Sequence, residues 1–166
     1  MFAPLHATTL QQLSLSDMIA QSTAIVHAKV TGSYSAVRGA GIYTFYRLQV
    51  SETLKPAGQP ANQTMDVAVP GGAANGMLQT VPGAPKIDAG ADYVLFLWTS
   101  RSGLTQVIGL SQGLFRMTQD STGNAIIVRP ASTVLMLGKN GAAITDQSTT
   151  LRWSDVRSQI RSAVGN

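Results

Sequence analysis

Apolar and polar positions alternate along much of the first half of the chain. In residues 24–34, Val26, Ala28 and Val30 alternate with more polar neighbours, as expected for a strand with one buried face. The same period of two recurs in residues 42–54 and 64–69. The glycine-containing turn at 38–41 would join the first two segments into an antiparallel hairpin. The first half of the chain is therefore predicted to form three strands.

The second half opens with an apolar run at residues 93–98, which is typical of a strand covered on both faces. Residues 105–110, 113–118 and 125–129 predict further short strands, and residues 120–123 a tight turn between the last two. The pattern over residues 133–146 is ambiguous, and no helix or strand is predicted there.

Helical spacing occurs at both ends of the strand-rich region. Ser14 followed by Asp17 has the form of a helix N-cap and predicts a short helix over residues 14–21. Ser154, with Val156, Ile160 and Val164 at helical spacing after it, predicts a C-terminal helix over residues 154–164.

This order of elements predicts a mainly β fold. Five or six strands with one long connection after the third favour a small OB-like Greek-key barrel, with a short N-terminal and a C-terminal helix. We expect one domain over residues 1–166, with the barrel at about 22–130. A β-sandwich is the structural alternative.

Residues 70–90 form a connector rich in proline and glycine, whose only charged side chains are Lys86 and Asp88. Connectors of this length are uncommon in compact domains unless they are functional or disordered. The apolar residues in it argue against a solvated linker. We therefore expect an ordered flap that binds a partner through Gly71, Gly72, Asn75, Met77, Leu78, Val81, Pro82 and Lys86.

Composition narrows the possible functions. The 166-residue chain has 12% charged residues, against about 25% in typical domains, and a net charge of +4 from scattered basic residues. It has no cysteine, so disulfides and thiolate chemistry are excluded. No apolar run approaches the length of a membrane span. The protein is therefore either cytosolic or exported, periplasmic or extracellular, with its signal removed, and a surface poor in charged residues is commoner in exported proteins.

Residues 109–113 match the G-x-S-x-G pattern of a hydrolase nucleophile elbow, with Ser111 as the nucleophile. An elbow needs a helix after it and a later histidine. Residues 114–118 instead alternate like a strand, and both histidines, His6 and His27, lie upstream. The pattern is better explained as a glycine-bounded bend, and hydrolysis at Ser111 is the third alternative for the function.

Metal and cofactor sites are not predicted. Two histidines are too few for a zinc site, and the pair Asp88 and Asp92 supplies too few oxygens for calcium. We expect no catalytic residues, no metal and no cofactor.

A second alternative is binding of single-stranded nucleic acid. Tyr43, Phe45 and Arg47 share one face of a predicted strand, and Lys29 could lie beside them. OB barrels bind single strands by stacking bases on aromatic side chains in a basic groove. A small barrel also uses aromatic residues as core, and we therefore expect a protein or peptide partner rather than nucleic acid.

Several segments together resemble a group of small exported bacterial proteins of unassigned function. They are residues 22–30, 42–46, the Val-Pro-Gly-Gly corner ending at Gly72, and residues 82–85, 90–97 and 109–113. The group is similar to the netrin-like modules and tissue inhibitors of metalloproteinases. The resemblance covers residues 10–129 and implies an OB-type barrel that acts as an exported binding or inhibitory module. Because those inhibitors act through an N-terminal cysteine, which this chain lacks, no inhibitory residue is implied.

Together these observations predict a non-enzymatic exported module that binds a protein or peptide through residues 70–90.

Overall fold

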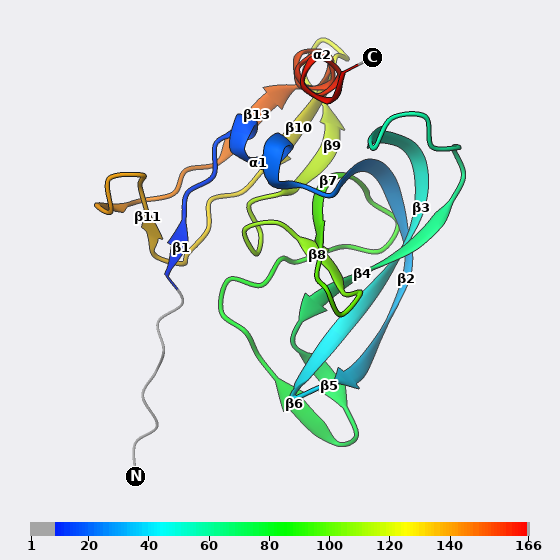
Figure 1. The fold of residues 1–166 in the computed structure, drawn as a ribbon, viewed down its shortest axis with the longest axis vertical. Helices are drawn as coiled ribbons and strands as arrows, with labels where there is room; N and C mark the ends of the chain where they lie inside the picture. The colour runs from blue at the N-terminus through cyan, green and yellow to red at the C-terminus, as the bar shows by residue number, and fades with distance from the viewer. Residues whose placement is uncertain (1–8, 166) are drawn as a thin grey trace.

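A computed structural model describes residues 9–165 and confirms a mainly β fold with two helices (Figure 1). The strands are β1 (Leu10–Gln11), β2 (Ala24–Arg38), β3 (Gly41–Lys55), β4 (Thr64–Pro70), β5 (Gly72–Ala74), β6 (Met77–Gln79), β7 (Asp92–Thr99), β8 (Thr105–Val107), β9 (Leu114–Gln119), β10 (Ala125–Arg129), β11 (Met136–Leu137), β12 (Ala143–Ile144) and β13 (Thr149–Arg152). The helices are α1 (Leu15–Gln21) and α2 (Trp153–Val164). Neither helix is long and apolar enough to span a membrane.

The main sheet is antiparallel and open. Its strand order is β13-β10-β9-β7-β2-β3-β4, and β8 pairs with the end of β7. The edge strands β4 and β13 do not pair with each other, so a small barrel of five to six strands is not confirmed. The long β2–β3 hairpin contains three register shifts, and such irregularities increase local bending and twist. The sheet curls enough to bring β4 close to β8.

The sheet buries apolar side chains on both faces. The inner cluster includes Val26, Ala28 and Val30, the three β2 residues that the alternating pattern places together. The outer cluster includes Val94 and Phe96 and is covered by side chains of α1 and α2. Because β7 contributes to both clusters, its unbroken apolar run is explained by burial on two sides.

The first helix begins where the sequence predicts. Ser14 caps α1 by accepting a hydrogen bond from the backbone N–H of Asp17, and the Asp17 side chain accepts one from the Ser14 backbone in return. The predicted cap of the second helix is wrong. α2 begins at Trp153, and its N-cap is Arg152, whose side chain makes no capping bond, because the chain enters α2 directly from β13.

The segment left open by the sequence, residues 133–146, forms β11 and β12 with an irregular lead-in. β11 pairs in parallel with β1 and antiparallel with β12. A buried ion pair holds this region to the main sheet: Arg129 donates to Asp146 through Nη1 at 2.6 Å and Nη2 at 3.0 Å. The backbone N–H of Ser132 donates to the same carboxylate at 2.7 Å.

Candidate binding site

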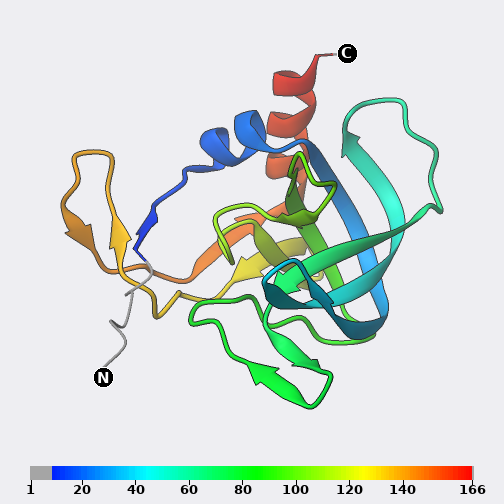
Figure 2. The same ribbon diagram turned by 60° about the horizontal axis from the view of Figure 1, so that its bottom comes forward.

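The first part of the connector at residues 70–90 is a β-hairpin. β5 and β6 pair antiparallel, and the two residues between them, Asn75 and Gly76, both have positive φ, at 54° and 74°. Positive φ at both central residues defines the type I′ turn, which Asn-Gly strongly favours. Figure 2 shows the hairpin at the opposite end of the molecule from α2. The expected ordered flap therefore contains regular structure that the length of the connector did not reveal.

The hairpin is fixed to the β2–β3 hairpin at its base. The backbone N–H of Ile42 donates to Oε1 of Gln79 at 2.9 Å, and the hydroxyl of Thr44 donates to the carbonyl of Gly71 at 2.9 Å. A Cβ at Gly72 would lie 2.5 Å from Thr44 Oγ1 and 2.7 Å from Ser35 Oγ. The close approach requires glycine at position 72, where φ is +134°.

The hairpin presents large apolar side chains to solvent. Met77 is 56% exposed and Leu78 is 78% exposed. Asn75 at the turn is also exposed, whereas Gly71 at the base is buried and Gly72 is half-buried. The two residues are consecutive in β6, so their side chains project from opposite faces of this well-held hairpin, and each face offers an apolar contact to a partner.

The second part of the connector packs against the body of the protein. Ile87 is buried in the inner cluster. The backbone N–H of Asp88 donates to the Tyr93 hydroxyl at 3.0 Å, and the Asp88 carboxylate accepts from Arg116 at 2.8 Å. Of the other predicted binding residues, Val81 is half-buried, while Pro82 and Lys86 are exposed.

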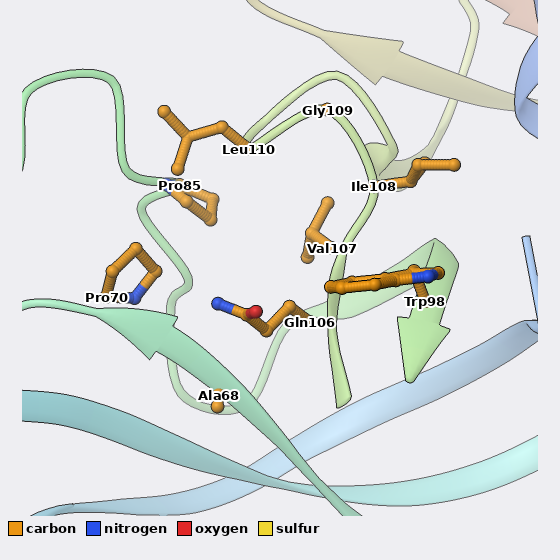
Figure 3. A pocket seen from close by; sticks show the side chains of 9 residues that line it. All are labelled: Ala68, Pro70, Pro85, Trp98, Gln106, Val107, Ile108, Gly109 and Leu110. Atoms are coloured by element: carbon orange, nitrogen blue, oxygen red, sulfur yellow. The ribbon is translucent and has the colours of Figure 1, made fainter. Parts of the chain in front are cut away.

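A small pocket of about 240 Å³ lies where the connector meets β4 and β8 (Figure 3). Pro70 and Pro85 of the connector lie across from Trp98, and the Gln106 side chain extends between Trp98 and Pro70. No charged residue lines it. Neither Trp98 nor Gln106 is among the binding residues predicted from the sequence. The apolar run at residues 93–98 predicts a strand covered on both faces, but Trp98 at its end is 45% exposed.

The predicted nucleic-acid face is only partly available. Phe45 is 7% exposed and stacks on Tyr34, with their ring centroids 5.2 Å apart, and Tyr43 lies against it with centroids at 6.5 Å. Arg47 is exposed but pairs with Asp66, Nε to Oδ1 at 3.2 Å. The hydrogen bond to the Asp66 side chain is the main reason that the pKa of Arg47 is raised.

Lys29 is exposed on β2, where its register partner is Gln49 of β3. Tyr43 and Phe45 lie further along β3, nearer the other end of the hairpin, opposite Ala36 and Tyr34. The structure therefore brings the two aromatic residues together and leaves Lys29 apart from them along the ladder.

The Gly109–Gly113 segment is a turn between β8 and β9, and a strand, not a helix, follows it. Gly109 and Leu110 have positive φ, at 61° and 64°. Gln112 is 2% exposed; it accepts from the backbone N–H of Leu13 at 2.8 Å and donates to the carbonyl of Gln11 at 2.9 Å. A Cβ at Gly113 would lie 2.8 Å from the carbonyl of Phe96. Gly109, Gln112 and Gly113 are thus fixed by their backbone conformation or contacts, whereas the side chain of the half-buried Ser111 forms no hydrogen bond with another described residue.

His27 lies on β2 beside Trp153 of α2, with ring centroids 6.1 Å apart, and its Nε2 is 3.9 Å from Oδ1 of Asp92. His6 lies outside the described residues. Within residues 9–165, no group of three or more His, Cys, Asp or Glu side chains could hold a metal ion. Asp88 and Asp92, the pair considered for a cation, instead face Arg116 and His27 respectively.

Comparison of the chain with protein-family models, with curated proteins and with solved structures gives no significant match.

Proposed function

We propose that this protein is a non-enzymatic binding module that engages a protein or peptide partner through residues 70–90. The observation that carries the proposal is the exposure of Met77 and Leu78 on a hairpin held by Gln79. Burying a methionine or leucine side chain contributes about 1.5 to 3 kcal/mol each. A partner that covers one face of the hairpin gains one such contribution, and a partner that encloses both faces gains two.

The fixed base of the hairpin supports the proposal. A segment that is already ordered before binding loses less conformational entropy when a partner binds it. The bonds from Ile42 and Thr44, together with the tight position of Gly72, hold the base in place while the tip remains exposed. The hairpin has no charged side chain, which favours a partner surface that is apolar and complementary in shape.

We further propose that the protein is exported, which its low content of charged residues supports. Fractionation of the producing organism tests this part separately: recovery from the periplasm or medium is expected, and recovery from the cytosol would contradict it. The inhibitor-like role implied by the family resemblance stays a prediction.

Site-specific photocrosslinking tests the binding surface. Leu78 is replaced by benzoylphenylalanine, and Ser121, an exposed residue of the β9–β10 turn, receives the same replacement as a matched control. The expected result is one partner that crosslinks at position 78 and not at position 121. That partner is then purified, and the Met77→Ser/Leu78→Ser variant should bind it at least about tenfold more weakly, since both apolar contacts are lost.

Two results would contradict the proposal. The first is an identical set of crosslinks at positions 78 and 121. The second is a purified partner that binds the double variant as tightly as the unmodified protein. Circular dichroism and urea unfolding of the variant establish that the fold is retained, which the exposure of both side chains leads us to expect.

A further inference from the structure

The pocket at the base of the connector places an aromatic ring beside an amide. Trp98 and Gln106 are register partners in the β7–β8 ladder, so their side chains project from the same face. Figure 3 shows both side chains at the pocket, with Pro70 and Pro85 on the other side. The pocket therefore combines an indole ring, two pyrrolidine rings and one amide group.

The Gln106 amide is available to a ligand. Gln106 is half-buried, and its side chain forms no hydrogen bond with another residue of the described chain, although the side chains on the neighbouring turns and strands do. A glutamine amide has two N–H donors and an acceptor oxygen. This combination matches the carbonyl and N–H groups of a peptide backbone.

The size and charge of the pocket restrict what it can hold. Its volume of about 240 Å³ is below the ~300 to 1,000 Å³ of sites for drug-sized ligands. With no charged side chain in its walls, it offers no counter-ion for a phosphate, carboxylate or ammonium group. An uncharged ligand group the size of one or two small side chains fits these limits.

We propose that this pocket binds a proline ring from an extended, proline-containing peptide. Trp98 is 45% exposed, so the flat apolar face of a proline ring can pack against its indole. A polyproline II segment makes no internal hydrogen bonds, so its carbonyls are free to accept from the Gln106 amide. Aromatic-lined grooves recognise proline-rich segments in this way because the peptide is already extended. The inference rests on the proposed binding function and assigns the partner a second contact, separate from Met77 and Leu78.

Nuclear magnetic resonance titration with an acetylated nonaproline peptide tests the inference. The indole N–H of Trp98 and the side-chain amide of Gln106 are expected to shift, while the indole N–H of Trp153, on α2, stays in place. Trp98→Ala should weaken binding by about tenfold or more, and Gln106→Ala by about threefold to tenfold, as for one neutral hydrogen bond. Ser121→Ala, in the exposed β9–β10 turn, serves as the control and should leave nonaproline affinity unchanged.

Three outcomes would overturn the inference. The first is no shift of the Trp98 indole N–H at peptide concentrations up to ~1 mM. The second is an unchanged nonaproline affinity in Trp98→Ala. The third is an equal affinity for a glycine–serine peptide with one central leucine.

The two proposals fail separately. If crosslinking at position 78 succeeds while nonaproline leaves Trp98 in place, the proline site is wrong and the binding function stands. If nonaproline binds at Trp98 while the purified partner binds the Met77→Ser/Leu78→Ser variant as tightly as the unmodified protein, the assignment of the hairpin as the partner surface is wrong instead.

Discussion

Arg129 and Asp146 show how a single buried pair can fix the path of a long irregular segment. Their side chains are 10% and 1% exposed, and two hydrogen bonds join them. The Arg129 guanidinium is the main cause that lowers the pKa of Asp146, with a further contribution from the Ser132 N–H, while burial acts in the opposite direction. The pair links β10 to the chain before β13, a contact between residues that no local pattern connects.

The stability of the protein should depend on pH through this carboxylate. Because the folded pKa of Asp146 lies below the unfolded value of about 3.9, the pair stabilises the fold above about pH 4, and this contribution is lost as pH falls through the folded pKa. Asp17, bonded by Ser14, and Asp120, bonded by Thr122, have pKa values lowered to about 2 and act in the same direction. Urea unfolding at a series of pH values should show a level free energy from pH 7 to 5 and a decline below pH 4.

Asp146→Asn is the comparison variant for this prediction. It leaves the Arg129 charge buried without its counter-ion, which typically costs about 3 to 5 kcal/mol at neutral pH. The variant should also show a shallower decline below pH 4. An unfolding free energy that falls as steeply in the variant as in the unmodified protein would assign the acid sensitivity to other carboxylates.

At the scale of elements, alternation and capping predicted the local structure well. The helix capped by Ser14, the paired strands β2 and β3, and β10 lie where the pattern placed them. The Asn75-Gly76 dipeptide is a hairpin signal in the sequence, and the structure has a β-hairpin at this position. The short strands β1, β11 and β12 carry no period of their own, since two residues are too few to show one.

Gly72→Ala should loosen the β5–β6 hairpin. The added Cβ meets Thr44 and Ser35, and alanine is strained at φ +134°; together these effects should cost about 1 to 3 kcal/mol. Hydrogen exchange at the amides of β5 and β6 should become faster, as measured by nuclear magnetic resonance. Gly123→Ala is the matched control, because Gly123 also has positive φ but has open space around it. Equal effects of the two substitutions on hairpin exchange would disprove the close-packing argument.

At the scale of the whole molecule, the topology could not be read from the sequence. The patterns predicted strands but not which strands form the edges, because closure depends on curvature and on contacts between distant residues. The sheet remains open between its edge strands β4 and β13, and the Trp98 pocket lies where β4 approaches β8. The sequence does not predict the pocket for the same reason. Curling of the sheet brings together residues that are distant in the chain, namely Pro70, Pro85, Trp98 and Gln106.

The scattered charge of the molecule leads to a prediction about nucleic acid. Phe45 is covered by Tyr34 and Tyr43, and Arg47 is paired with Asp66, so two of the predicted contact residues are already engaged within the protein. Lys29 is exposed but lies apart from the aromatic residues along the ladder, which disfavours one groove for bases and phosphates. Fluorescence anisotropy with a labelled oligothymidine should show no binding at low salt. Binding that weakens as salt rises, and that is lost in a Tyr43→Ala variant, would support the alternative function instead.

The turn at Gly109–Gly113 bears on how this protein could be traced among distant sequences. If this segment were a hydrolase elbow, Ser111 would be the nucleophile and would be conserved in related sequences. The packing of Gln112 between the Leu13 and Gln11 backbones, the left-handed backbone at Gly109 and the contact of Gly113 with Phe96 indicate the reverse. In related sequences we therefore expect Gly109, Gln112 and Gly113 to be conserved and Ser111 to vary. The spacing G-x-x-Q-G, rather than G-x-S-x-G, should then identify this turn.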